Sequence, residues 1–140
     1  MNFSNLTKTD LIQYIQSMET TPISEDSLAM DYIRLETINY QQENFILLVL
    51  STANKPLKSK VIFKGARDAS LVDPKLIFQE FLKTPYASSM IVAHNHPSGG
   101  LEPSHQDRLV TERLRKGCEI LGIQFLDHLI FNQFNHVRVI

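Results

Sequence analysis

This 140-residue sequence has only one cysteine, no tryptophan and almost no excess of either charge. Cys118 is its single cysteine, which excludes a disulfide within the chain and a zinc site of the Cys-x-x-Cys kind. The 14 Lys and Arg residues are balanced by 15 Asp and Glu residues, so the formal net charge is −1. Because phosphate backbones are usually bound by a basic excess, a broad nucleic-acid surface is disfavoured, although a local basic patch is not.

The sequence also lacks a long apolar segment. Its longest clean apolar run covers residues 45–50, far short of the roughly 20 residues that cross a bilayer, so we expect no membrane partner. The first residues do not have the form of a secretory signal peptide, in which a charged segment precedes an apolar one. A single cysteine is also typical of a reducing compartment. We therefore expect a cytoplasmic protein, long enough for one domain with its own apolar core.

Helical and strand patterns alternate along the chain. Helices are expected from the capping box at residues 7–10, over residues 24–35, over residues 73–82 and over residues 104–122. Strands are expected over residues 45–50, 58–64, 89–93, 123–131 and 134–140. This order predicts an α/β fold in which helices flank a mixed central β-sheet. The domain is expected to cover residues 41–140, with a helical arm over residues 1–40.

Two histidines, His94 and His96, stand one residue apart at the end of an expected strand. Because strand side chains alternate between faces, both imidazoles point the same way, with their Cα atoms roughly 6.6 Å apart. The following Pro-Ser-Gly-Gly turn lets the chain return and bring Asp107, in the first turn of the next helix, beside the two rings. Two neutral histidines and one carboxylate leave an open position on zinc, where bound water loses a proton near neutral pH.

The alternative is an ordinary helix cap beside two surface histidines. Ser104-x-x-Asp107 has the form of a capping box, and a carboxylate with two oxygens can serve as cap and as ligand at once. On these residues alone, both interpretations stay open.

The same residues resemble the JAMM (MPN+) metalloprotease motif, which is an upstream glutamate followed by H-x-H and S-x-x-D. The stretches AHNHPSG, EPS, LGI and LDH are more similar still to the bacterial RadC family, over about residues 43–131. The resemblance implies an MPN-type α/β domain, with layers like those of cytidine deaminases, that hydrolyses peptide or isopeptide bonds. It also implies that Zn²⁺ is held by His94, His96 and Asp107.

The resemblance assigns two further roles. Glu43, just before a strand, would take a proton from zinc-bound water and pass it to the leaving amine. Ser104 would donate a hydrogen bond to the oxyanion of the tetrahedral intermediate, a contact worth about 3 kcal/mol. Nothing local ties Glu43 to His94, and Glu36 and Glu80 are its competitors.

The sequence departs from the RadC pattern in three places. A short arm stands where a helix-hairpin-helix-like segment is usual, V-D-P-K-L replaces V-H-P-R-E at residues 72–76, and the usual Ser- and Gly-containing tail is missing after residue 131. These changes affect substrate choice and DNA association more than zinc chemistry. Besides the hydrolase, two functions stay open: a DNA-repair-associated protein that acts on or near DNA, and a zinc-stabilised interaction module without turnover.

Three further histidines, the cysteine and the clustered basic residues are the remaining candidates. His128 supports a metal ligand or is a structural histidine, His105 faces solvent, Cys118 belongs to the core, and His136 has no assigned role. The basic residues of the last long helix are expected on a solvated face: Arg113, Arg115 and Lys116. Four lysines on the second expected strand and the turn before it would suit an anionic partner or protect a sheet edge: Lys55, Lys58, Lys60 and Lys64. The N-terminal arm could form a packing or homodimer contact.

Overall fold

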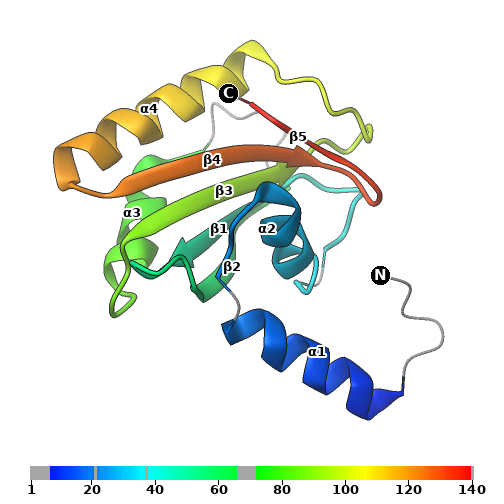
Figure 1. Cartoon of the computed structure of the whole chain (residues 1–140). Helices are drawn as coiled ribbons and strands as arrows, with labels where there is room; N and C mark the ends of the chain where they lie inside the picture. Colours follow the sequence, from blue (N-terminus) through cyan, green and yellow to red (C-terminus); the bar gives the residue numbers. More distant parts are fainter. Residues whose placement is uncertain (1–6, 21, 37, 66–71, 140) are drawn as a thin grey trace.

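The computed structural model describes residues 7–20, 22–36, 38–65 and 72–139. In these residues five strands form one sheet in the order β2-β1-β3-β4-β5 (Figure 1). The strands are β1 (Asn44–Leu50), β2 (Pro56–Lys64), β3 (Ser89–Asn95), β4 (Gln124–Phe131) and β5 (His136–Arg138). The helices are α1 (Lys8–Thr20), α2 (Asp26–Ile33), α3 (Pro74–Leu82) and α4 (His105–Leu121). Only β3 and β4 pair in parallel, so the sheet is mixed and the predicted α/β fold is confirmed.

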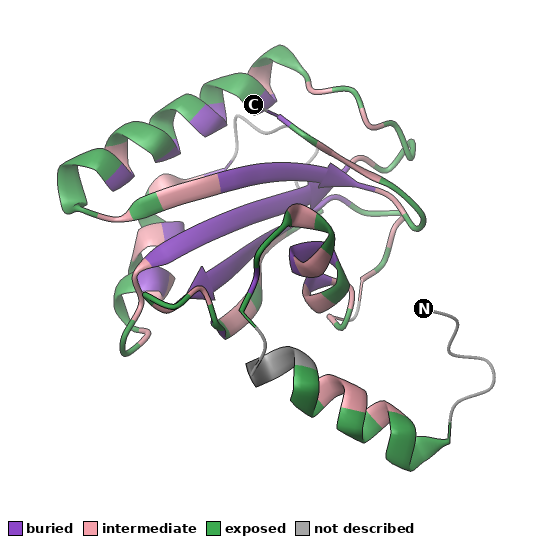
Figure 2. Cartoon of the chain, viewed as in Figure 1, coloured by how far each residue is buried: buried purple, intermediate pink, exposed green. Residues whose placement is uncertain are grey.

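Helices cover both faces of this sheet, and β1 shows the consequence. Every residue of β1 is buried, as its unbroken run N-F-I-L-L-V-L requires (Figure 2). Phe45, Leu47 and Val49 pack with residues of α3 and α4 in one core cluster. The alternate residues of β1 pack with α2 in a second cluster on the opposite face: Ile46, Leu48 and Leu50. The sheet is therefore the middle of three layers.

Helix α4 begins and ends where the sequence indicates. Ser104 is its N-cap, and its side-chain oxygen accepts a hydrogen bond from the backbone N–H of Asp107. Gly122 follows the helix with a φ of 70°, the left-handed conformation that glycine adopts without strain. Cys118 lies in the core as predicted, and its burial raises the pKa of the thiol to about 11.

Several predicted boundaries were wrong. Helix α2 covers Asp26–Ile33 rather than residues 24–35, because Glu25 is already extended at its N-cap. Strand β5 covers only His136–Arg138, because residues 132–135 form a turn in which the Asn132 side chain accepts hydrogen bonds from the backbone N–H groups of Phe134 and Asn135. Residue 140, the end of that prediction, lies outside the described residues.

The N-terminal helices differ in their packing. Helix α2 places Ala29, Met30 and Ile33 in the second core cluster, whereas the two clusters of described residues include none from α1. Helix α1 contacts β2, the strand at one edge of the sheet, and lies outside the two core clusters (Figure 1). The domain boundary at residue 40 stays a prediction. Of the helices in the described residues, none combines the length and apolar composition that crossing a bilayer requires.

Candidate metal centre

The antiparallel pairing of β1 with β3 brings the two distant parts of the motif together. Phe45 is the register partner of His94, so the start of β1 lies beside the end of β3. Glu43, directly before β1, is thereby placed next to the histidines although 51 positions separate it from His94 along the chain. Strand register supplies the link that local sequence does not.

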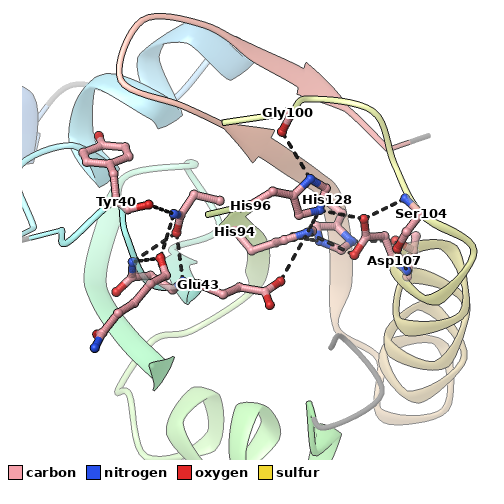
Figure 3. Close-up of polar contacts among 12 residues, drawn as sticks. Tyr40, Glu43, His94, His96, Gly100, Ser104, Asp107 and His128 are labelled. Atoms are coloured by element: carbon pink, nitrogen blue, oxygen red, sulfur yellow. Dashed lines mark hydrogen bonds and ion pairs between the residues drawn. The ribbon is translucent and has the colours of Figure 1, made fainter. Parts of the chain in front are cut away.

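Four side chains converge at this edge of the sheet (Figure 3). The Nε2 atoms of His94 and His96 lie 3.1 Å apart. Each also approaches the Asp107 carboxylate, His94 Nε2 at 3.0 Å from Oδ1 and His96 Nε2 at 3.1 Å from Oδ2. Glu43 Oε1 is 4.0 Å from His94 Nε2. One ligand atom from each of Glu43, His94 and His96 lies within 4.8 Å of the other two, as a shared metal ion requires.

Asp107 combines both functions that the sequence left open. Its Oδ2 accepts a hydrogen bond of 2.8 Å from the backbone N–H of Ser104, which completes the capping box of α4. Its Oδ1 faces His94. The cap and the approach to the histidines therefore coexist, and the cap holds the carboxylate in place.

The electrostatics of the cluster favour a buried negative charge. Burial by itself raises the pKa of Asp107, but the contacts of its two oxygens with the imidazoles of His94 and His96 outweigh burial, so that the pKa of this carboxyl lies well below its usual value. The contact with Asp107 also raises the pKa of His96, and burial opposes this effect without cancelling it. Burial, followed by the neighbouring His94, lowers the pKa of His128 well below that of an ordinary histidine.

The spacing of the donors fits a divalent cation. In a tetrahedral site with bonds of about 2.0–2.1 Å to histidine nitrogen, neighbouring ligand atoms lie about 3.3 Å apart. The three closest spacings here are 3.0 to 3.1 Å. His96 Nδ1 lies 3.1 Å from the carbonyl oxygen of Gly100, to which only a protonated Nδ1 can donate. Its Nε2 then keeps the lone pair that a metal needs.

A buried pair of asparagines holds the segment that carries Glu43. Asn95 Nδ2 donates to the carbonyl oxygen of Gln42 at 2.8 Å, and Asn44 Nδ2 donates to the carbonyl oxygens of Asn39 and Gln42 at 2.9 and 3.0 Å. Asn44 and Asn95 are each 1% exposed. These bonds tie the loop before β1 to the end of β3, so the position of Glu43 is determined from both sides.

A hollow of about 240 Å³ opens beside His96. Its lining includes Tyr40, Pro97, Asn132 and Phe134. Asn132 Nδ2 donates to the carbonyl oxygen of Gly99 at 3.0 Å and so connects the two loops that form the hollow. Apart from His96, the described residues that line it are uncharged at every pH near neutrality.

The competing candidates lie elsewhere. Glu80 is on α3, where it pairs with Lys58 at 2.7 Å and with Lys60 at 2.9 Å, so two of the four lysines proposed for an anionic partner have a carboxylate partner. Glu36 follows α2 in a turn. His105 is exposed on the first turn of α4, and His136 Nε2 lies 3.1 Å from an oxygen of Asp26.

Comparison with known proteins agrees with this arrangement. The family model described as RadC-like JAB domain matches residues 23–138. The chain belongs to this family. A UPF0758 protein of Shouchella clausii is 44% identical over 108 residues, which are 77% of this chain and 46% of that protein. A UPF0758 protein of Trichormus variabilis is 39% identical over 119 residues, covering 85% of this chain and 49% of that protein. The RadC-like chain thus spans about half the length of these curated relatives, whose names state no activity.

Sequence reasoning on this RadC-like domain missed the residues that support the cluster. Asn44, Asn95 and Thr111 carry no motif of their own, and their partners lie up to 55 positions away. The one available signal was a polar residue within a segment expected to be buried, since Asn44 directly precedes an apolar strand and Asn95 lies between two histidines.

Proposed function

We propose that this RadC-like domain is a zinc-dependent hydrolase that cleaves amide bonds in a peptide or isopeptide-linked substrate. The supporting observation is the convergence of Glu43, His94, His96 and Asp107 at one edge of the sheet. Two histidines and the aspartate would form a ligand set that leaves one coordination position open, as catalytic zinc sites do. The glutamate would then be the group that handles a proton.

His94, His96 and Asp107 would hold the zinc ion. Zinc bound there would lower the pKa of water toward 7 and polarise the scissile carbonyl. The Asp107 carboxylate supplies negative charge, and its low pKa keeps it ionised across the physiological range. Its hydrogen bond from the Ser104 backbone keeps it oriented toward the two rings.

Glu43 is the proposed general base and acid. Its carboxylate, which is almost fully buried, lies 4.0 Å from His94 Nε2, so a water bound to zinc beside both groups would be within reach to give it a proton. After the attack on the carbonyl carbon, the same carboxyl would deliver that proton to the leaving nitrogen. The asparagine-bound loop before β1 fixes the distance on which both transfers depend.

Ser104 is the proposed donor to the oxyanion. Its Oγ accepts the N–H of Asp107, and this bond leaves the hydroxyl hydrogen available for a second partner. The side chain is exposed at the start of α4, so a substrate carbonyl can reach it. The hollow beside His96, whose lining is otherwise uncharged, would receive an uncharged residue next to the scissile bond.

The test compares zinc-loaded protein with Glu43→Gln on fluorogenic peptides and on isopeptide-linked conjugates. Glu43→Gln should keep its zinc and lose about 10²- to 10⁴-fold in turnover, the usual contribution of general acid–base catalysis. Glu102→Gln, which changes an exposed carboxylate in the loop before α4, is the matched control and should remain active. Equal turnover in Glu43→Gln and wild type would remove Glu43 from the mechanism, and zinc-loaded wild type inert on both substrate classes would overturn the hydrolase.

A further inference from the structure

Behind the proposed zinc ligands, three buried side chains form an unbroken chain of polar contacts. His94 Nδ1 lies 2.8 Å from His128 Nε2, and His128 Nδ1 lies 2.6 Å from Thr111 Oγ1. The Thr111 hydroxyl in turn donates to the backbone carbonyl oxygen of Asp107 at 3.0 Å. His94 and His128 are 1% and 0% exposed, so water does not compete for these contacts.

The hydrogen bond from Thr111 to the Asp107 carbonyl determines where the protons lie in this series of contacts. A carbonyl oxygen can only accept, so the single hydroxyl hydrogen of Thr111 points at Asp107. The hydroxyl oxygen must then accept from His128, which puts the proton of that imidazole on Nδ1. A neutral His128 has its lone pair on Nε2, so His94 must donate from its own Nδ1. The lone pair of His94 is left on Nε2, the atom that faces His96 and Asp107.

We propose that Thr111 and His128 are positioning residues that hold His94 in its Nε2-ligating tautomer and thereby set the affinity of the metal centre. The proposal rests on the proposed function only in taking His94 as a metal ligand. His96 reaches the same tautomer by a simpler route, through the carbonyl oxygen of Gly100. His94 lies deeper in the fold, and its Nδ1 proton is accepted by His128, which in turn donates to Thr111. We call His128 and Thr111 the relay.

The relay makes helix α4 serve both sides of the centre. Its first turn offers the Asp107 carboxylate directly, and the backbone carbonyl of Asp107 anchors the relay through Thr111, four residues later on the same helix. The orientation of one ligand and the protonation pattern of another therefore depend on a single helical turn. Phe45 stacks on His94 with ring centroids 5.9 Å apart and adds to the restraint on that ring.

Replacing the Thr111 hydroxyl with a methyl group tests the relay, because the side chain keeps nearly the same shape. Thr111→Val removes the acceptor of the His128 proton, which frees His128 to protonate Nε2 and to oppose the required tautomer of His94. We expect zinc affinity, measured by competition with a chromogenic chelator, to fall about 10- to 100-fold, as is typical when the hydrogen-bond partner of a ligand is lost. Thr111→Ser keeps the hydroxyl and should restore zinc affinity to within a few-fold of wild type.

A second control separates orientation of the ligand from stability of the fold. Val110→Ala makes a cavity at the neighbouring buried position of α4, in the core cluster that also includes Leu114 and Cys118. This variant should lower the unfolding midpoint and leave zinc affinity unchanged. If Val110→Ala weakens zinc as much as Thr111→Val at an equal loss of stability, the relay is only structural and the proposal fails.

Nitrogen-15 NMR of the metal-free protein provides a readout that needs neither zinc nor turnover. His128 should appear as the Nδ1-protonated tautomer in wild type and in Thr111→Ser, because its Nε2 accepts from His94 Nδ1 and its Nδ1 donates to Thr111. An Nε2-protonated His128 in wild type would overturn the proposal, even if Thr111→Val does not fold. A wild-type protein with the expected tautomers and tight zinc binding but no hydrolysis would overturn the proposed function alone.

Discussion

Asn95 accepts two hydrogen bonds from Asn44 across the β1–β3 pair, from the backbone N–H at 2.8 Å and from the side-chain amide at 3.0 Å. Both residues adjoin the candidate metal centre along the chain, since Asn44 follows Glu43 and Asn95 stands between His94 and His96 in the sequence. Because the same side chains bind the carbonyl groups of the loop before β1, they connect the strand that carries the histidines to the residue that would move the proton.

Asn44→Ala should destabilise the fold and displace Glu43. The change leaves the buried side-chain oxygen of Asn95, and the carbonyl oxygens of Asn39 and Gln42, with one donor fewer, at a cost of about 1–3 kcal/mol in the free energy of unfolding. Urea denaturation measures this cost, and zinc content should be unchanged because no ligand is removed. Asn135→Ala, at an exposed position, is the control and should change the free energy by less than about 0.5 kcal/mol.

His96→Ala should abolish tight metal binding, since it removes a proposed ligand and leaves the buried Asp107 facing one imidazole. The loss of affinity should exceed the about 10- to 100-fold that follows from losing a residue behind a ligand. Metal content of the purified protein and calorimetric titration with zinc provide the measurement. His105→Ala, nine residues further along the chain and exposed, should retain the metal; a His96→Ala protein with full zinc content would contradict the ligand set.

Ser104→Gly separates the two tasks of this serine. Glycine replaces an N-cap serine at a cost of only a few tenths of a kcal/mol, whereas alanine costs about 1 kcal/mol, so the glycine variant loses the hydroxyl with little loss of stability. If Ser104 donates to the oxyanion, kcat should fall roughly 10²- to 10³-fold with a small change in KM. Ser104→Thr should retain activity. Wild-type kcat in Ser104→Gly would show that the residue acts as a cap alone.

Features that depend only on residues close together in the sequence were predictable. The apolar run of β1, the capping residues of α4 and the glycine after it depend on neighbours along the chain, and the structure has all three as expected. The approach of Asp107 to the histidine pair was predictable in the same way, because 14 positions and one turn contain all three residues. Local patterning therefore accounted for the layers and for most of the candidate centre.

What could not be predicted depends on pairing between distant segments. The proximity of Glu43 to His94 follows from the register of β1 against β3, which no local pattern specifies. His128 comes near His94 because β3 and β4 pair in parallel, and Thr111 comes near His128 because one face of α4 packs over these strands. A polar residue on a mainly apolar face has no partner until the packing is known.

Glu80→Gln should change the dependence of stability on pH. Hydrogen bonds from Lys58 and then Lys60 lower the pKa of Glu80 to about 2 from an ordinary 4.5. Since the pKa is lower in the folded state, the stabilisation is fully present above pH 4.5 and is lost as the pH falls toward 2. The difference in unfolding midpoint between wild type and Glu80→Gln should therefore shrink from pH 6 to pH 3. Glu112→Gln, whose pair with Lys116 is longer at 3.8 Å and well exposed, should differ little from wild type at either pH.

Gly117→Ala tests how closely α3 and α4 approach each other. A Cβ atom at Gly117 would lie 2.6 Å from Cζ and 2.7 Å from Cε2 of the Phe78 ring, well inside contact distance. Alanine normally stabilises a helix interior by about 0.5–1 kcal/mol relative to glycine, but forcing the ring aside should cost about 1–3 kcal/mol, so we expect net destabilisation in urea. In a Phe78→Leu background the obstructing ring atoms are gone, and the same substitution should become neutral or stabilising. Equal effects in both backgrounds would show that the contact with Phe78 is not what excludes a side chain at position 117.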